Sequence, residues 1–158
     1  MIWNFGRRTK AYRANSKFLI DDQDYQNFVK GYSFKLHPKG YVQYSSTKDG
    51  LCNKRLHRVI MGDPDGKMID HINVNKLDNR RENLRIATNQ QNQCNRNKTK
   101  SNKSGFKGVS FNKNRQKFQA QISIDGKKKH IGYFATAAGA HECYKKAAIK
   151  YHGEFARV

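Results

Sequence analysis

Short apolar and aromatic runs alternate with turn-forming residues along the first half of the chain. Three of these runs have the length and the aromatic or β-branched content of strands: residues 18–20, 32–36 and 41–45. A His-Pro-Lys-Gly segment at residues 37–40 separates the last two runs and favours a hairpin. Residues 56–61 carry apolar positions at helical spacing and stop at Gly62, which predicts a short helix.

The middle of the chain predicts a strand, a polar loop, a second strand and a helix. Residues 68–71 are predicted to form the first strand, and residues 84–87 are expected to pair with it as its antiparallel partner. Thr88 and Gln91 match a capping box, with Thr88 as the N-cap and Gln91 at the third helical position. The helix that starts there would carry Asn92 in its first turns.

The periodicity changes after a basic stretch rich in Asn, Lys and Ser, and residues 98–103 are predicted to be a linker. Three strand-length runs follow, at residues 106–112, 117–124 and 129–134. Asp125-Gly126, between the last two runs, is a strong signal for a tight hairpin. Apolar and polar residues alternate along 117–124, so this sheet is expected to have one apolar and one polar face.

A helix over residues 136–152 would cover the apolar face of that sheet. Thr136 suits the N-cap and Gly153 the position just after the last turn. Its apolar positions fall on one stripe: Ala137, Ala140, Tyr144, Ala147, Ala148 and Tyr151. The predicted fold class is α+β, with a basic arm (1–16), a first module (17–97), the linker, and a second module (104–158).

The charge of the chain indicates which kind of molecule the protein binds. The sequence has 32 Lys and Arg against 12 Asp and Glu, a net charge of +20, and only 36% hydrophobic residues. Such an excess repels itself in a compact protein and attracts a polyanion. Nucleic acid is the expected partner, because neutralised phosphates release counterions. A merely basic or ribosome-type RNA-binding protein is the alternative on charge alone.

Three separated cysteines, Cys52, Cys94 and Cys143, provide no C-x-x-C pair, which argues against a zinc ribbon or finger. An odd number of cysteines without a disulfide framework suits a protein in a reducing compartment. The first residues have no apolar core of a secretory signal, and no stretch approaches the length of a membrane span. We therefore expect an intracellular protein that is not secreted and does not engage a membrane.

Four side chains in the middle segment suggest phosphodiester hydrolysis: Asp70, His71, Asn83 and Asn92. That reaction needs a base for water and a hard cation for the phosphate charge. Mg²⁺ prefers oxygen ligands and keeps several waters, so one carboxylate and one amide can suffice as protein ligands. Neighbours on a strand point to opposite faces unless the strand ends there, and a loop starting at His71 would supply that ending.

Residues 56–61, 69–73, 75–85 and 88–92 together resemble the HNH endonucleases of the homing type found in phages. The resemblance implies a ββα-metal fold with one divalent ion, Mg²⁺ or Mn²⁺, held by Asp70 and Asn92. It implies His71 as the general base and Asn83 as the residue that orients it. Val74 stands where relatives often have Gly or a small polar residue.

Non-catalytic roles remain open for some of the same residues. Asn83 could be a turn residue that bonds its own backbone, and Asn92 an exposed helix amide among many. His57 matches a recurrent histidine of these nucleases, with a role open between structure and DNA phosphate contact. Three arginines beside the site are expected to contact phosphate: Arg80, Arg81 and Arg85.

Residues 103–157 resemble the Apetala-two (ethylene-response-factor-like) DNA-binding domain through segments at 104–109, 117–122, 130–134 and 153–156. In that family a three-stranded sheet packs on one helix and lays its polar face in the major groove. Six residues are predicted to face DNA: Lys107, Arg115, Lys117, Gln119, Gln121 and His130. Lys127, Lys128 and Lys129 are expected to contact DNA phosphates. Such contacts position the protein on the duplex but do not read the base sequence.

The combined prediction is a divalent-metal-dependent endonuclease that hydrolyses phosphodiester bonds in double-stranded DNA. It would act as a monomer or a homodimer on DNA, without a small-molecule substrate, in the cytoplasm of the host cell if phage-encoded. A non-catalytic DNA-binding regulator that kept the nuclease shape is the second possibility.

Overall fold

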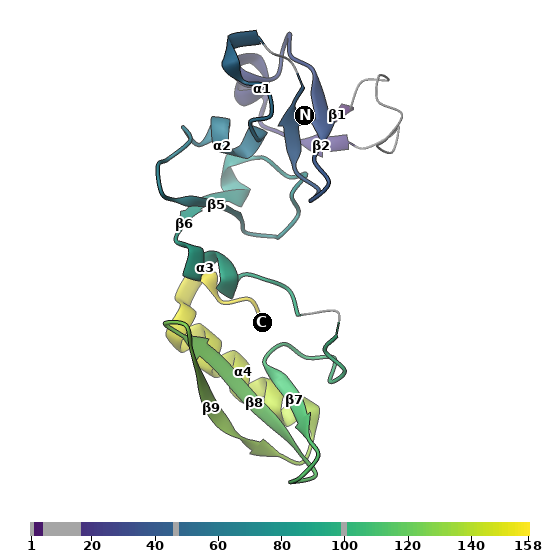
Figure 1. The fold of residues 1–158 in the computed structure, drawn as a ribbon, viewed down its shortest axis with the longest axis vertical. Coiled ribbons are helices and arrows are strands. Elements are labelled where there is room, and N and C mark those ends of the chain that lie inside the picture. The colour runs from purple at the N-terminus through teal and green to yellow at the C-terminus, as the bar shows by residue number, and fades with distance from the viewer. Residues whose placement is uncertain (1, 5–16, 46–47, 99–100) are drawn as a thin grey trace. The chain divides into compact units, whose positions relative to one another are not determined.

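The computed structural model describes residues 2–4, 17–45, 48–98 and 101–158, which form small antiparallel sheets and short helices (Figure 1). The chain divides into two compact units, Met1–Thr88 and Asn89–Val158. The helix predicted after Thr88 therefore belongs to the second unit, whereas the sequence placed the boundary after residue 97. Among the described residues no helix is both long and apolar enough to cross a membrane.

The first unit pairs its strands as antiparallel hairpin-like couples, β1 with β2, β3 with β4 and β5 with β6. Its elements are β1 (Ile2–Asn4), β2 (Lys17–Leu19), α1 (Asp22–Phe28), β3 (Phe34–Leu36), β4 (Val42–Tyr44), η1 (Lys48–Gly50), α2 (Leu56–Ile60), β5 (Met68–His71), η2 (Arg81–Asn83) and β6 (Leu84–Ala87). The predicted β3–β4 hairpin, the α2 helix and the β5–β6 pair are confirmed, and β5 and β6 have the predicted bounds.

Two features of the first unit differ from the sequence prediction. Ile2–Asn4 form a strand against β2, so this part of the predicted basic arm is ordered by strand pairing, and residues 5–16 lie outside the described residues. The helix α1 was not predicted. Asp21 precedes it with extended backbone, and Asp22 and Asp24 in its first turn suit the positive end of the helix dipole.

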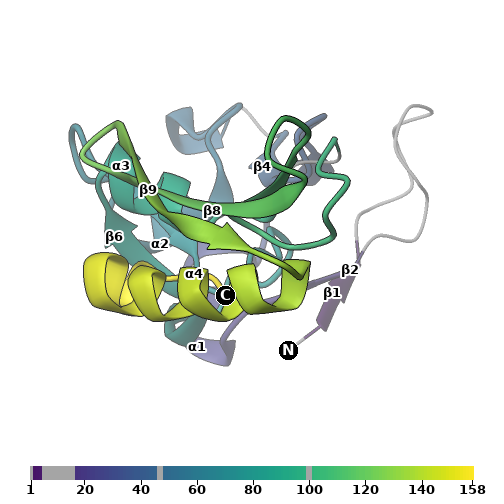
Figure 2. The same cartoon turned by 90° about the horizontal axis from the view of Figure 1, so that it is seen from below.

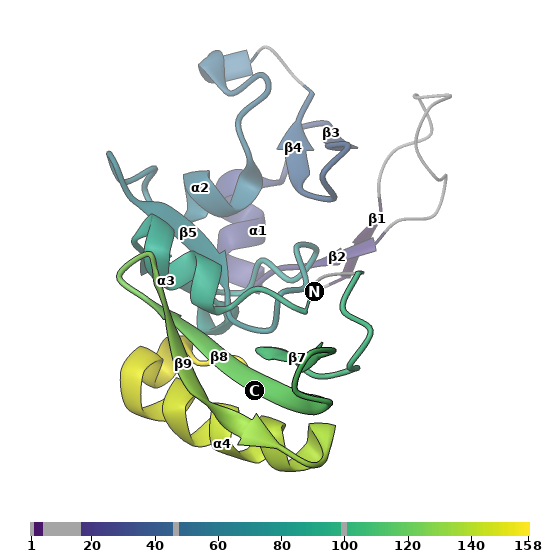
Figure 3. The ribbon, with the colours of Figure 1, turned by 60° about the horizontal axis from the view of Figure 1, so that its bottom comes forward.

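The core of the first unit gathers around β2, β4, α2 and the β5–β6 hairpin. Phe18, Val42, Tyr44 and Leu56 are at most 1% exposed. The Phe34 and Tyr44 rings meet at a centroid distance of 4.7 Å, and α1 packs beside α2 (Figure 3). This core holds the β5–β6 hairpin, which carries the candidate chemistry.

The second unit is a three-stranded antiparallel sheet covered on one face by a single helix, as predicted (Figure 2). Its elements are α3 (Asn89–Cys94), β7 (Val109–Asn112), β8 (Lys117–Ile124), β9 (Lys127–Phe134), α4 (Ala137–His152) and η3 (Gly153–Phe155). The β8–β9 turn has positive φ at both Asp125 and Gly126, the conformation that an Asp-Gly hairpin favours. Thr136 caps α4 by accepting a hydrogen bond from the Gly139 backbone at 3.1 Å.

The α4 stripe packs on the sheet as expected, except at its end. Ala140, Tyr144 and Ala148 are buried against β7 and β8. Tyr151 was predicted to belong to the stripe, but it is 41% exposed and its hydroxyl accepts a hydrogen bond from Lys129. The helix ends at His152, so Tyr151 lies in its last turn at the rim of the sheet, where solvent reaches it.

Candidate active site

The β5–β6 hairpin places Asp70 and His71 side by side at the end of a strand. In its antiparallel register Asp70 lies opposite Arg85, and His71 lies opposite Leu84. Successive residues of a strand face opposite sides, so the two functional side chains leave the hairpin on different faces. Both are buried, with 5% of Asp70 and 4% of His71 exposed.

Asp70 is paired with a cation across the hairpin. Arg85 donates from Nε and Nη2 to the same carboxylate oxygen, Oδ2, at 3.0 and 2.9 Å. The predicted phosphate contact Arg85 is thus tied to the predicted metal ligand. Because a buried carboxylate requires a nearby positive charge, Arg85 is the partner that stabilises the charged form of Asp70 in this structure.

His71 sits in a cluster of rings. The His57 ring lies edge-on at a centroid distance of 4.9 Å, and the Tyr41 ring lies at 6.1 Å. Nε2 of His71 is 3.5 Å from Oδ1 of Asn79. Burial lowers the pKa of His71, against the opposing effects of Asn79 and of the Asp70 and Asp78 charges. A lowered pKa favours the uncharged imidazole, which is the form that can accept a proton.

His57 is the most deeply buried ring of this cluster, with 2% exposed and its Nδ1 left without a hydrogen-bond partner. Burial, followed by the neighbouring His71 and arginine charges, lowers the pKa of His57 to about 3. A neutral, buried imidazole suits a structural role beside His71 better than a direct ionic contact with phosphate.

Asn83 fixes the loop that follows His71. Its Oδ1 accepts a hydrogen bond from the Asn73 backbone at 2.9 Å, and its Nδ2 donates to the Asp78 carbonyl at 2.8 Å. It thus holds both sides of the loop, while Asn79, which the sequence analysis did not single out, meets the His71 ring. Val74 in the same loop has φ of 59°, a left-handed conformation that suits Gly or Asn.

Arg80 and Arg81, also predicted to bind phosphate, are engaged by carboxylates. Arg80 contacts Asp78 through Nε and Nη2 at 2.9 and 2.8 Å and also pairs with Glu82. Arg81 makes two 2.8 Å hydrogen bonds to the buried Asp24 on α1. These contacts pin the loop to the rest of the unit, so both arginines have structural partners in addition to any contact with DNA.

A divalent cation at Asp70 is chemically compatible with this arrangement. The described residues contain no group of three His, Cys, Asp or Glu side chains able to hold a metal. A magnesium site built from one carboxylate and one amide does not need such a group. Arg85 bonds only Oδ2 of Asp70 among the contacts above, and a carboxylate oxygen is a ligand that Mg²⁺ prefers. Asn92, the predicted amide ligand, is half-buried on α3 in the second unit.

The open face of the sheet in the second unit gathers several of the residues predicted to read DNA. Nε2 of Gln119 lies 3.0 Å from Nδ1 of His130, and Gln121 pairs in register with His130. The His130 and Tyr133 rings meet at 4.6 Å, and the Arg115 guanidinium lies 4.8 Å from the centre of the Tyr133 ring. The structure therefore brings amide, imidazole and guanidinium groups together on one exposed surface.

The remaining lysines divide between the two sides of this unit. Lys117, Lys127 and Lys128 are exposed. Lys129 donates to the Tyr151 hydroxyl at 3.0 Å, which places its side chain on the α4 side. Lys107 is turned into the unit, where its Nζ donates to the carbonyls of Cys94 and Arg157 at 2.5 and 3.3 Å.

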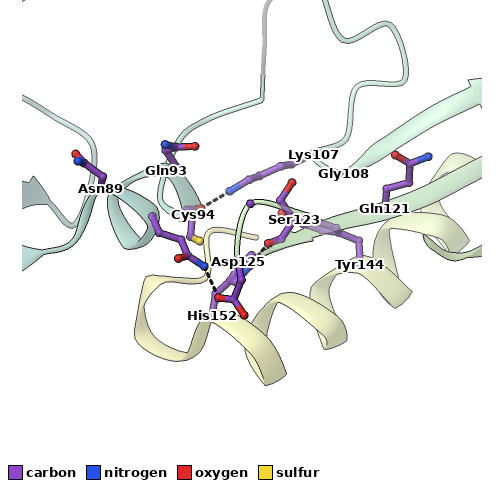
Figure 4. A pocket seen from close by; sticks show the side chains of 12 residues that line it. Asn89, Gln93, Cys94, Lys107, Gly108, Gln121, Ser123, Asp125, Tyr144 and His152 are labelled. Carbon is purple, nitrogen blue, oxygen red and sulfur yellow. Dashed lines mark hydrogen bonds between the residues drawn. The ribbon is translucent and has the colours of Figure 1, made fainter. Parts of the chain in front are cut away.

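A cavity of about 630 Å³ lies within the second unit, between α3, the β8–β9 turn and the end of α4 (Figure 4). Lys107 spans it to the end of α3, and Gln90 donates to Asp125 at 2.8 Å. His152 Nε2 lies 2.9 Å from the Ser123 carbonyl. These bonds tie α3 and the end of α4 to the sheet, and the cavity follows from this polar packing.

Comparison with known proteins assigns the hairpin to a family. The HNH endonuclease family matches residues 54–94, which contain the β5–β6 hairpin and its candidate residues. The chain is 34% identical over 151 residues to an uncharacterised HNH endonuclease, L560, of Acanthamoeba polyphaga mimivirus, covering 91% of this chain and 75% of that protein. This chain belongs to the HNH endonuclease family.

A second viral relative supports the assignment. Protein 3.8 of Escherichia phage T7 is 34% identical over 94 residues, which is 60% of this chain and 77% of that protein. No solved structure matches the chain. The HNH protein described here is accordingly a DNA endonuclease, of a family that generally uses a divalent metal ion.

Proposed function

We propose that this HNH protein is a homing-type endonuclease that hydrolyses double-stranded DNA with His71 as the general base. The observation that carries the proposal is the buried imidazole of His71 at the end of β5, adjacent in sequence to Asp70 and within the segment that matches the HNH endonuclease family. His71 would accept a proton from water while the water oxygen bonds to phosphorus. The bond to the 3′ oxygen would break, and that oxygen would take a proton from solvent, leaving 5′-phosphate and 3′-hydroxyl ends.

Asp70 and Asn92 are proposed as the protein ligands of one Mg²⁺ or Mn²⁺. When bound, that ion would neutralise charge on the phosphate and on the departing 3′ oxygen. Asn83 contributes by holding the loop after His71 at Asn73 and Asp78, and Asn79 contributes by contacting the His71 ring. The ββα-metal arrangement is proposed for this site because the resemblance to the HNH endonucleases of the homing type implies it.

The second unit is proposed as the DNA-reading module, similar to the Apetala-two domain. Support comes from its three-stranded sheet with one face covered by α4 and the other open. The open face carries Gln119, His130 and Arg115, side chains that can bond base edges or phosphates. This module would select the site at which the first unit cuts.

The deciding experiment is cleavage of supercoiled plasmid and phage genomic DNA with Mg²⁺, Mn²⁺ or EDTA. His71→Ala and Asp70→Asn should abolish nicking and linearisation while leaving DNA binding intact. Asp65→Asn is the matched control, because Asp65 is an exposed carboxylate of the same unit. Unchanged cleavage by His71→Ala would refute the assigned base, and binding without cleavage under any metal would refute catalysis.

A further inference from the structure

Two basic side chains lie over one aromatic ring at the edge of the candidate active site, and two further lysines, Lys35 and Lys39, lie on the adjoining β3–β4 hairpin. The Arg55 guanidinium and the Lys76 ammonium each lie 4.6 Å from the centre of the Tyr41 ring. Lys76 Nζ also donates to the Lys39 carbonyl at 2.8 Å, and Lys35 Nζ donates to Asn53 Oδ1 at 2.8 Å from the neighbouring strand β3. We call Lys35, Lys39, Arg55 and Lys76 the Tyr41 cation cluster.

The cluster is assembled from three separate segments. Lys35 and Lys39 come from the β3–β4 hairpin, Arg55 from the residue before α2, and Lys76 from the loop after β5. The same loop is held by Asn83 and begins at His71. The cluster is therefore positioned by the elements that position the base.

No carboxylate balances these charges. All 12 acidic residues of the chain lie in the described part, and none of them forms an ion pair with a member of the cluster there. By contrast, Arg80, Arg81 and Arg85 each contact a buried aspartate. The basic residues of this unit thus divide into a paired set and an unpaired set.

The unpaired charges act on one another. Burial, then Arg55 and Lys39, lower the pKa of Lys76. His37, in the same hairpin, also has its pKa lowered, by burial and then by all four members of the cluster. Like charges held this close destabilise the isolated unit and become favourable once a polyanion is bound.

The cluster adjoins the base directly. The Tyr41 ring lies 6.1 Å from the His71 ring and 5.1 Å from the His57 ring, measured between centroids. A polyanion that contacts Lys76 and Arg55 over Tyr41 would therefore also reach the rim of the His71 site.

We propose that the Tyr41 cation cluster binds backbone phosphates of duplex DNA beside the bond to be cut. The proposal rests on the proposed function for its substrate. In the first unit, Lys39, Arg55 and Lys76 would contact the DNA phosphates. Arg80, Arg81 and Arg85 would stabilise the loop through their aspartate partners. Phosphate contacts of this kind fix the register of the duplex without reading sequence.

The test measures binding without metal, so that it does not depend on cleavage. The full chain with Lys39→Gln, Arg55→Gln and Lys76→Gln is compared with Lys17→Gln, Lys30→Gln and Lys67→Gln. The control removes the same charge from exposed lysines of the same unit. Fluorescence anisotropy with labelled duplex DNA in EDTA, over a series of salt concentrations, gives the affinity and the slope of log Kd against log salt.

The cluster variant should lose affinity on the order of 10- to 100-fold, and its salt slope should fall by roughly 0.9 per lost phosphate contact. The control should change much less. Lys39→Arg with Lys76→Arg should restore binding, and thermal unfolding should show that the cluster variant still folds. Equal affinities and slopes in the two triple variants would overturn the proposal, even if metal-dependent cleavage is confirmed.

Discussion

Arg85 and Asp70 face one another across the β5–β6 hairpin, where the guanidinium makes two hydrogen bonds to one carboxylate oxygen. The Asp70 and Arg85 side chains are 6% and 12% exposed, so removing the cation leaves a buried negative charge. Arg85→Gln should lower the free energy of unfolding by about 3 kcal/mol. Urea denaturation at pH 7 in EDTA measures this loss.

The double variant Asp70→Asn, Arg85→Gln should recover part of that loss, because it removes both charges together. Arg96→Gln, at an exposed position, serves as the control and should stay within roughly 0.5 kcal/mol of the parent. If Arg85→Gln is as stable as Arg96→Gln, Asp70 does not depend on Arg85. Added Mn²⁺ should stabilise Arg85→Gln more than the parent, because in the variant the metal ion replaces the guanidinium as the positive charge beside Asp70.

Val74 supplies a prediction about the loop between the hairpin strands. Its φ of 59° is unfavourable for a β-branched residue, and the turn is closed by its amide bonding the His71 carbonyl at 2.8 Å. Val74→Asn should raise the free energy of unfolding by about 1 kcal/mol, because Asn tolerates the left-handed conformation. Val74→Ala is the control and should gain less. A loss of stability in Val74→Asn would mean that packing of the valine outweighs the backbone cost.

The sequence predicted the hairpin correctly because its information is local. Two short segments with apolar residues, 68–71 and 84–87, with polar turn-forming residues between them, are sufficient to predict two paired strands. The same holds for the Asp125-Gly126 turn and for the Thr136 cap of α4. The Asp125-Gly126 turn and the Thr136 cap depend on residues a few positions apart, and the two strands of the hairpin are joined by a single loop.

What the sequence did not reveal depends on distant contacts. Helix α1 has few apolar positions, and its buried side includes Asp24, whose burial requires Arg81, 57 residues away. The pairing of Arg85 with Asp70, 15 residues away, has the same origin. Similarly, Arg55 and Lys76 meet at Tyr41 only after three segments have packed together.

Gly108 offers a sharp test of the packing in the second unit. Its φ is +74°, and a Cβ at this position would lie 2.1 Å from a carbon of the Tyr144 ring, which is itself 3% exposed. Gly108→Ala should therefore destabilise the unit by about 3 kcal/mol or more. Gly105→Ala is the matched control, since φ is +81° there but no atom lies within 4 Å. It should cost about 1 kcal/mol. Similar losses in both variants, measured by urea denaturation of the full chain, would mean that Tyr144 moves to make room.

His57 gives the first unit a predictable response to acid. Its pKa is about 3 in the folded protein, below the ordinary value of 6.5. The unfolded chain therefore binds a proton that the folded chain does not, and stability is lost as the pH falls from 6.5 towards 3. The loss from this residue at pH 5 is about 2 kcal/mol.

His57→Phe should remove that part of the acid sensitivity and also the cost of the buried, unpartnered Nδ1, about 1 kcal/mol. Urea midpoints at pH 7 and pH 5 should therefore converge in the variant relative to the parent. His37→Phe is the comparison, because His37 lies in the β3–β4 turn and is less deeply buried than His57. If the parent and His57→Phe lose the same stability between pH 7 and pH 5, His57 is protonated in the folded state, and a charged imidazole beside His71 would then favour the phosphate-contact role over the structural one.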